Sequence, residues 1–182
     1  TVTTRSTDEV QSASPVEFEA AITRVWQECA RVLKSDGLLA FTFHQARLPG
    51  WVALARALAE AGLVVTAVQP VKGEMTTSVT KGGVEPSNLD AVIVCRKRCS
   101  ALPCSLIDPR TAAGVGEHRL TELRAAGVDV GAGDIRSVIR GHVLATYTAD
   151  PAALDLPSLA ALADDLAAEQ VNRMVARRVV SG

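Results

Sequence analysis

His44 and Gln45 stand where a buried strand is predicted to end, and both side chains are able to accept hydrogen bonds. The strand is predicted from the nearly continuous apolar run over residues 37–43, GLLAFTF, because a strand covered on both faces lacks polar alternation. Open α/β sheets bind their ligands at the carboxyl ends of their strands. His44 and Gln45 are therefore candidate substrate contacts on the rim of a site, with an ordinary polar strand end as the alternative interpretation.

A polar, glycine-containing segment over residues 69–89 is the second candidate. Connections of this length are uncommon and usually have a function. The segment carries Lys72, Glu74 and Lys81, and lysine contacts to phosphate position a nucleic acid without reading its sequence. We expect these three residues to lie near the same edge as His44, in a loop that either contacts substrate or is simply solvated.

The four cysteines raise the question of a metal site. The run Cys95-x3-Cys99-x4-Cys104, followed by His118, does not match a common zinc ribbon or finger. Cys95 also falls within a predicted strand. We therefore expect no metal ligands and interpret these cysteines as buried or linker residues. A Ser-His-Asp pattern, paired carboxylates and a phosphate-binding glycine loop do not stand out either, and His142 is interpreted as a packed histidine.

The elements that must position these residues follow the order α-β-α-β-loop-β. The first helix begins at Ser14-Pro15-Val16-Glu17, where a cap is followed by proline and glutamate. Further strands are predicted over 63–68 and 90–95, and later helices over 117–126, 134–148 and 157–177. The expected organisation is a disordered lead-in over 1–13, an α/β part over 14–98, a linker over 99–116 and a helical tail over 117–182.

Composition narrows the functional classes. The chain is 48% hydrophobic and 21% charged, which is enough apolar content for a packed core. Its net charge of −1 gives no basic footprint of the kind that nucleic-acid-binding modules carry. Phosphate contacts of a DNA enzyme would therefore lie largely outside this segment. No apolar run is long enough to cross a membrane and no signal pattern opens the chain, so we expect a cytoplasmic protein.

Residues 28–44 resemble a segment of a known protein family. The run ECARVLKSDG followed by LLAFTFH resembles the RVLKPDG helix-turn-strand of Rossmann-like S-adenosylmethionine-dependent methyltransferases, with Ser35 where proline is common. The longer run adds the helix with Trp51, LAEAGLVVTAVQPV and DAVIVCRKR. Together these resemble the adenine-specific DNA methylases that also contain a zinc ribbon. The tail LRAAGVDVGAGDIRSVIRGHVLATYT agrees, so the resemblance covers roughly residues 16–175.

The resemblance implies a partial Rossmann-like methyltransferase sheet. That family's sheet has the strand order 3-2-1-4-5-7-6 with strand 7 antiparallel, and residues 38–43, 63–68 and 90–95 correspond to strands 5, 6 and 7. Strands 1 to 4 are not found in this sequence. They carry the glycine-rich loop for the cofactor and an Asp-Pro-Pro-Tyr-type tetrapeptide for the flipped base. The Asp-Pro pairs at Asp108 and Asp150 lack the second proline and the tyrosine.

The function that the resemblance implies is the carboxyl-terminal portion of a DNA (adenine-N6) methyltransferase. S-adenosylmethionine would bind the full-length enzyme and not this chain alone, so we assign no catalytic or cofactor residue here. The strand at 38–43 would present an unpaired edge. A chain that carries the missing half of the sheet, or a second copy of this one, is the expected partner, with DNA bound by the full-length enzyme. A methyltransferase half for another substrate, or a structural interaction module, remains open.

Overall fold

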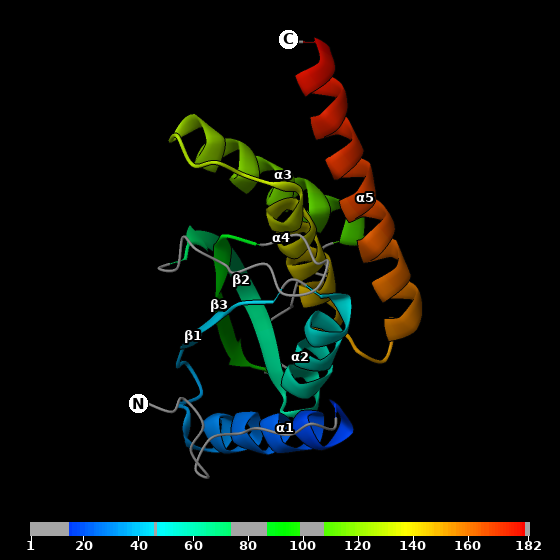
Figure 1. Ribbon diagram of the computed structural model, residues 1–182. Coiled ribbons are helices and arrows are strands. Elements are labelled where there is room, and N and C mark those ends of the chain that lie inside the picture. Colours follow the sequence, from blue (N-terminus) through cyan, green and yellow to red (C-terminus); the bar gives the residue numbers. More distant parts are fainter. Residues whose placement is uncertain (1–14, 46, 74–86, 99–107, 181–182) are drawn as a thin grey trace, which may run out of the picture.

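The computed structural model describes residues 15–45, 47–73, 87–98 and 108–180. The fold is α/β, with helices packed around a three-stranded antiparallel sheet (Figure 1). The expected lead-in over 1–13 lies outside the described residues. The elements are α1 (Pro15–Val32), β1 (Leu39–Phe43), α2 (Leu48–Glu60), β2 (Leu63–Lys72), β3 (Leu89–Lys97), α3 (Pro109–Ala125), α4 (Ala132–Ala145), a short 3-10 helix (Thr146–Thr148) and α5 (Leu156–Val180).

The strand order in the sheet is β1-β3-β2, and β3 runs antiparallel to both neighbours. β1 and β2 therefore run in the same direction and end at the same end of the sheet. The register pairs Phe43 with Ala91 on one side of β3 and Lys72 with Leu89 on the other. A β-bulge interrupts β2 between Val65 and Ala67. Among the described residues, no strand pairs with the outer edge of β1.

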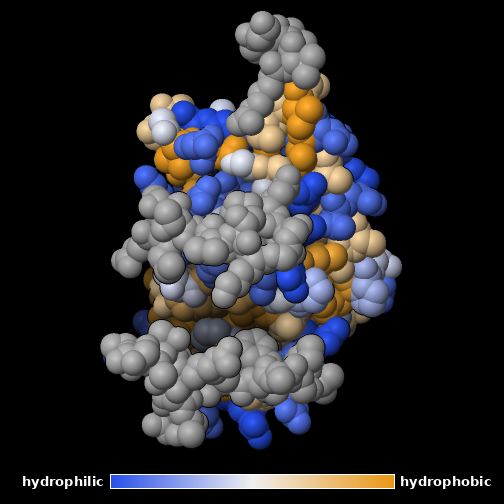
Figure 2. All heavy atoms as spheres, viewed as in Figure 1, coloured by the Kyte–Doolittle hydropathy of each residue, from blue (hydrophilic) through white to orange (hydrophobic). Residues whose placement is uncertain are grey.

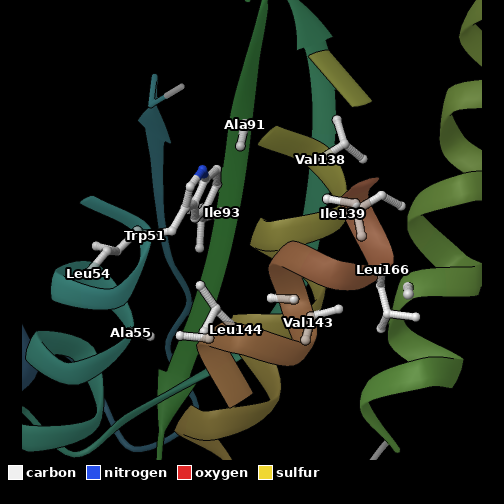
Figure 3. Close-up of a cluster of buried hydrophobic side chains, with 14 of the residues drawn as sticks. Trp51, Leu54, Ala55, Ala91, Ile93, Val138, Ile139, Val143, Leu144 and Leu166 are labelled. Atoms are coloured by element: carbon white, nitrogen blue, oxygen red, sulfur yellow. The ribbon is translucent and has the colours of Figure 1, made fainter. Parts of the chain in front are cut away.

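One face of the sheet carries the hydrophobic core. Alternate residues of β3 are buried, namely Leu89, Ala91, Ile93 and Cys95, because successive side chains of a strand point to opposite faces. Two aromatic contacts bring the first two helices onto the same face: Trp26 of α1 lies 4.4 Å from Phe41, and Trp51 of α2 lies 4.9 Å from Phe43, between ring centroids. Figure 3 shows Trp51 beside Ile93 of β3.

The helices after residue 108 are part of the same core. Most of α4 is buried, including Ile135, Ile139 and Leu144, and in Figure 3 its side chains meet both the sheet and α5. The turn after α4 is tied to the strands as well. The Val65 backbone N–H donates to Thr148 Oγ1 at 2.9 Å, and Arg98 donates to the Thr148 carbonyl at 2.7 Å. This packing joins α4 to both the sheet and the last helix.

The prediction of a linker as far as residue 116 is wrong for its second half, because α3 begins at Pro109. Asp108 caps the helix by accepting a hydrogen bond from the Thr111 backbone N–H at 3.0 Å, and Pro109 takes a first-turn position. Gly116, the last residue of the predicted linker, allows α3 to approach α4 closely: a Cβ there would lie 3.1 Å from His142 Nδ1. Residues 99–107 lie outside the described residues.

The long helix α5 extends beyond the sheet at its carboxyl-terminal end (Figure 1). Asp155 caps its first turn by accepting from the backbone N–H of Ser158 at 3.0 Å. In Figure 2, hydrophilic side chains are spread over the visible face and apolar ones show along α5. No helix in the described part of the chain combines the length and apolar character needed to cross a membrane.

Candidate functional site

Two of the predicted site residues lie at the same end of the sheet. His44 directly follows β1, and Lys72 is the last residue of β2. β3 begins at this end, so that Asp90 is placed between them. His44 and Lys72 therefore lie at the same end of the sheet, as expected. Glu74 and Lys81, the other two residues of the predicted loop, lie outside the described residues.

His44 forms a hydrogen bond with Asp90. The distance from His44 Nδ1 to Asp90 Oδ1 is 2.7 Å, and 56% of the His44 side chain and 31% of the Asp90 side chain remain exposed. The partnership follows from the register, because His44 lies one residue beyond Phe43, which pairs with Ala91. An ionised carboxylate only accepts hydrogen bonds, so the proton in this bond sits on Nδ1.

His44 and Lys72 lie on opposite faces of the sheet. Phe43 packs against Trp51 on the helix face, so the next residue, His44, falls on the other face together with Asp90. Lys72 pairs with the buried Leu89 on the helix face. There its side chain lines a hollow beside Asn88 and the α3–α4 turn at residues 126–129. A single small ligand would therefore not contact both side chains from one face.

Gln45 anchors the turn between β1 and α2. Its carbonyl accepts hydrogen bonds from Trp51 Nε1 at 2.9 Å and from Ser137 Oγ at 3.0 Å. Its side-chain oxygen accepts from the Arg47 backbone N–H at 2.9 Å. The side chain also fills the space above Gly50, where a Cβ would lie 2.1 Å from Gln45 Nε2. These contacts make Gln45 a structural residue of the turn, with its oxygens already engaged.

Asp134, the first residue of the helix predicted over 134–148, supports the site from within the core. The residue is fully buried in the first turn of α4. One carboxylate oxygen accepts from Ser87 Oγ at 3.0 Å and from the backbone N–H groups of Asn88 and Leu89 at 2.6 and 3.0 Å. The other accepts from the Gly131 backbone N–H at 2.9 Å. The four bonds fix the segment that leads into β3.

α4 therefore positions both members of the His44–Asp90 pair. Asp134 holds residues 87–89, directly before Asp90, while Ser137 holds the carbonyl of Gln45, directly after His44. Each of these contacts joins residues that lie far apart in the sequence, so single-sequence patterns do not reveal them. The local sequence signal for Asp134 is an acidic residue that follows the glycine-rich run Gly131-Ala-Gly133 at the start of a predicted helix.

A second hollow, of about 240 Å³, lies between the outer edge of β2, α3 and α4. Its walls are mostly apolar, with His142 and Arg119 among the lining residues. Burial lowers the pKa of His142, and its Nδ1 is 2.8 Å from the Val138 carbonyl. Nε2 is buried and has no hydrogen-bond partner among the described residues. His142 is thus a packed histidine that its lowered pKa keeps neutral near pH 7, and it lines the hollow with Arg119.

Cys95 has the properties of a core residue. It is completely buried in β3, and burial raises the pKa of its thiol to about 12. A protonated thiol is a poor metal ligand, since metals bind the thiolate. Over the described residues, no group of three or more histidine, cysteine or acidic side chains is arranged to hold a metal ion. Cys99 and Cys104 lie outside these residues.

Comparison of the chain with known proteins found no significant match to a protein-family model, a curated protein or a solved structure.

Proposed function

We propose that this chain is the carboxyl-terminal portion of an S-adenosylmethionine-dependent methyltransferase that acts on adenine in DNA. It would supply one edge of the enzyme's sheet. The reaction transfers a methyl group to the exocyclic amine of a base that has been extruded from the duplex. In such a reaction the protein acts mainly by holding the amine in line with the methyl group.

The observation that carries this proposal is the strand order β1-β3-β2 with an antiparallel central strand. Consecutive strands are usually neighbours in a sheet, and consecutive antiparallel strands typically form a meander. Here the last strand lies between the first two, which are parallel to each other. This is the arrangement that the resemblance implies for strands 5, 7 and 6, and it supports assigning residues 38–97 to that part of a methyltransferase sheet.

The outer edge of β1 supports the same proposal. In the described part of the chain, nothing pairs with this edge, although the side chains of Leu39, Phe41 and Phe43 are half-buried in the core. An unpaired strand edge is a template for another strand. In the proposed enzyme the fourth strand of the sheet would pair there, about 4.8 Å from β1.

The described residues do not fit a pocket for the methyl donor by themselves. The β1–α2 connection is a strand-to-helix turn of the type that binds cofactors in Rossmann-like folds. Its Gly50 is covered by the Gln45 side chain, which leaves no room for a ligand to approach the backbone. We therefore place the donor on the part of the sheet that lies before residue 38 in the complete enzyme.

The test has two parts, beginning with this chain alone. Calorimetry with S-adenosylmethionine is expected to show no binding, and hydrogen exchange is expected to show fast-exchanging N–H groups at alternate residues of β1. Alternate residues of a strand direct their backbone groups to the same neighbour, so those facing away from β3 are unprotected. Tight donor binding by the chain alone would contradict the assignment of the pocket to another segment.

The second part adds the polypeptide encoded upstream, either fused or mixed, and measures transfer of labelled methyl groups to DNA. The expected result is methylated adenine that depends on both parts, together with new protection of the fast β1 amides. Transfer to RNA or protein would support a methyltransferase but contradict DNA as its substrate. No transfer to any of the three, with no new protection, would refute the proposal.

A further inference from the structure

The hollow between β2, α3 and α4 lies at the outer edge of β2, the edge of the sheet opposite to β1. An inference about this hollow therefore does not rest on the proposed function, which concerns β1. Valine and alanine side chains supply most of its walls, among them Val65, Ala112 and Ala149. Its volume is about 240 Å³. An apolar cavity of about 150 Å³ holds benzene, so this hollow admits a ligand of roughly ten non-hydrogen atoms.

His142 of α4 gives this apolar hollow a hydrogen-bond acceptor. The residue is 6% exposed, and its Nδ1 lies 2.8 Å from the Val138 carbonyl. A carbonyl only accepts, so Nδ1 carries the hydrogen, and Nε2 of the neutral ring has the lone pair. Among the described residues, Nε2 is buried without a hydrogen-bond partner. Buried polar groups are nearly always partnered, and the partner that Nε2 needs is a donor.

Nε2 points toward the edge of β2. On the other side of the ring, a Cβ at Gly116 of α3 would lie 3.1 Å from Nδ1 and 3.3 Å from Cγ, and Nε2 lies across the ring from Cγ. The Val65 N–H is directed away from β3, to Thr148. The bulge adds one residue to β2, so Val68 is the next residue with its backbone groups on that outer side.

The Val68 carbonyl cannot be the missing partner, because it is itself an acceptor. It lies near enough to the ring to affect it. Burial and the charge of Arg119 lower the pKa of His142, and the Val138 and Val68 backbone groups oppose this effect. Two acceptors, Nε2 and the Val68 carbonyl, thus lie near each other at the wall of the hollow. A hydroxyl group placed there would supply the donor that Nε2 lacks.

We propose that this hollow binds a small phenol, whose hydroxyl group donates a hydrogen bond to His142 Nε2 and whose ring lies against the apolar walls. Ligand pockets commonly combine apolar walls with a few polar groups that fix orientation. A phenolic hydroxyl, with a pKa near 10, stays protonated at neutral pH. Nε2 has almost no exposed surface, so the hydroxyl must enter between α4 and β2. No described strand lies outside β2 to hold its edge in place.

Arg119 selects against donors that carry a positive charge. Its side chain lines the hollow, and its charge disfavours a second positive charge on His142. An ammonium group beside His142 would meet the same repulsion in surroundings that screen charge less than water does. Arg119 also forms an ion pair with Glu122, at 2.8 Å, which fixes the guanidinium on this side of α3. The preferred donor is therefore a neutral hydroxyl.

The first experiment titrates this chain with 4-ethylphenol and with 4-ethylanisole, in which a methyl group replaces the hydroxyl hydrogen. Nuclear magnetic resonance would follow His142 Nε2 and the amides of residues 65–69. We expect 4-ethylphenol to shift both and to bind about tenfold more tightly, the effect of one hydrogen bond. Equal affinities, or an unchanged Nε2 resonance while 4-ethylphenol binds, would overturn the proposal. Binding of neither compound would mean that the hollow holds water only, which also overturns it.

Variants then test the two polar residues. His142→Phe keeps a ring but removes the acceptor, so the preference for 4-ethylphenol over 4-ethylanisole should disappear, and a retained preference would contradict the role of Nε2. The Nε2 measurement in the wild type decides the same point without a variant. Arg119→Gln should bind 2-phenylethylamine, which the wild type excludes. Arg124→Gln, at an exposed position of the same helix, should still exclude it. Exclusion by Arg119→Gln as well would contradict selection by charge.

Discussion

Replacing Gly141 by alanine tests the contact between α4 and α2, on which the placement of the site depends. A Cβ at position 141 would lie 2.8 Å from Trp51 Cη2, 3.0 Å from Cζ3 and 3.2 Å from Cζ2. All three atoms belong to the six-membered ring of the indole. Trp51 has little freedom to move away, because it is 3% exposed, packs edge-on against Phe43 and donates to the Gln45 carbonyl.

The expected magnitude follows from two opposing effects. Alanine is better than glycine inside a helix by about 1 kcal/mol, whereas overpacking a filled core costs typically about 1–3 kcal/mol. Because Trp51 is held on several sides, we expect the clash to exceed the helical gain and the free energy of unfolding to fall by roughly 1–2 kcal/mol. Gly114 of α3 is the matched control, since a Cβ there would meet nothing within 4 Å. Gly114→Ala should raise stability by up to about 1 kcal/mol.

Urea unfolding followed by circular dichroism measures both variants. Trp51→Phe removes the outer ring atoms, so Gly141→Ala should cost less in that background, with a coupling of about 0.5–3 kcal/mol for residues in contact. If Gly141→Ala stabilises the protein as much as Gly114→Ala does, or if the coupling is zero, α4 is not packed against Trp51. The positions of Gln45 and Asp90 described above would then lose their support.

Three further predictions concern buried polar groups. Asp134→Ala leaves four donors without their acceptor and should lower the free energy of unfolding by roughly 3 kcal/mol or more, while the exposed Asp129→Ala should change it by less than about 0.5 kcal/mol in urea unfolding. Burial raises the pKa of Cys95 from 9.0 to about 12, so the unfolded chain loses this proton first. The free energy of unfolding should therefore fall as pH rises from about 9 toward 12. The same pH series on Cys95→Ala should lack this part of the fall. Burial lowers the pKa of His142 below 6.5, so the unfolded chain takes up this proton first and stability should fall as pH drops below 6.5. In His142→Gln that part of the acid sensitivity should be missing, and an identical slope in both proteins would contradict the burial of the ring.

The strands were predictable in place but not in length. The strands predicted over 38–43, 63–68 and 90–95 overlap β1, β2 and β3. However, β2 continues to Lys72 and β3 continues to Lys97. The end of β2, QPVK, belongs to the polar segment over 69–89 that the sequence predicts as a loop, and its proline is a poor strand residue. Its pairing with the start of β3 overrides that local preference. The bulge between Val65 and Ala67 also shifts the alternation of side chains, which hides the strand's period in the sequence.

The candidate site was predictable only where it depends on a strand end. His44 was identified because an apolar run stops before it, and this required no knowledge of other elements. In the sequence, its partner Asp90 is only the first residue of a predicted strand. The pairing of the two residues depends on the register between two strands, which is set by the whole sheet. The sequence predicts Gln45 as a substrate contact, with an ordinary polar strand end as the alternative, and neither depends on the backbone. The Gln45 carbonyl is held by Ser137, 92 residues further along the chain, a contact that no local pattern encodes.

Side chains of β1 are less buried than those of β2 and β3, and this difference bears on whether another strand pairs with the outer edge of β1. Ile93 and Cys95 in the central strand and Leu63 in β2 have at most 1% of their surface exposed. In β1, by contrast, even the residues on the helix face are only half-buried. β1 contains no fully buried residue, whereas β2 and β3 each contain several, so β1 should open first in the isolated chain. A strand paired at its outer edge would add both hydrogen bonds and burial there. Protection from hydrogen exchange should consequently rise most in β1 and least in β3 when the proposed partner segment binds. Equal protection of all three strands in the isolated chain would instead indicate a self-sufficient sheet.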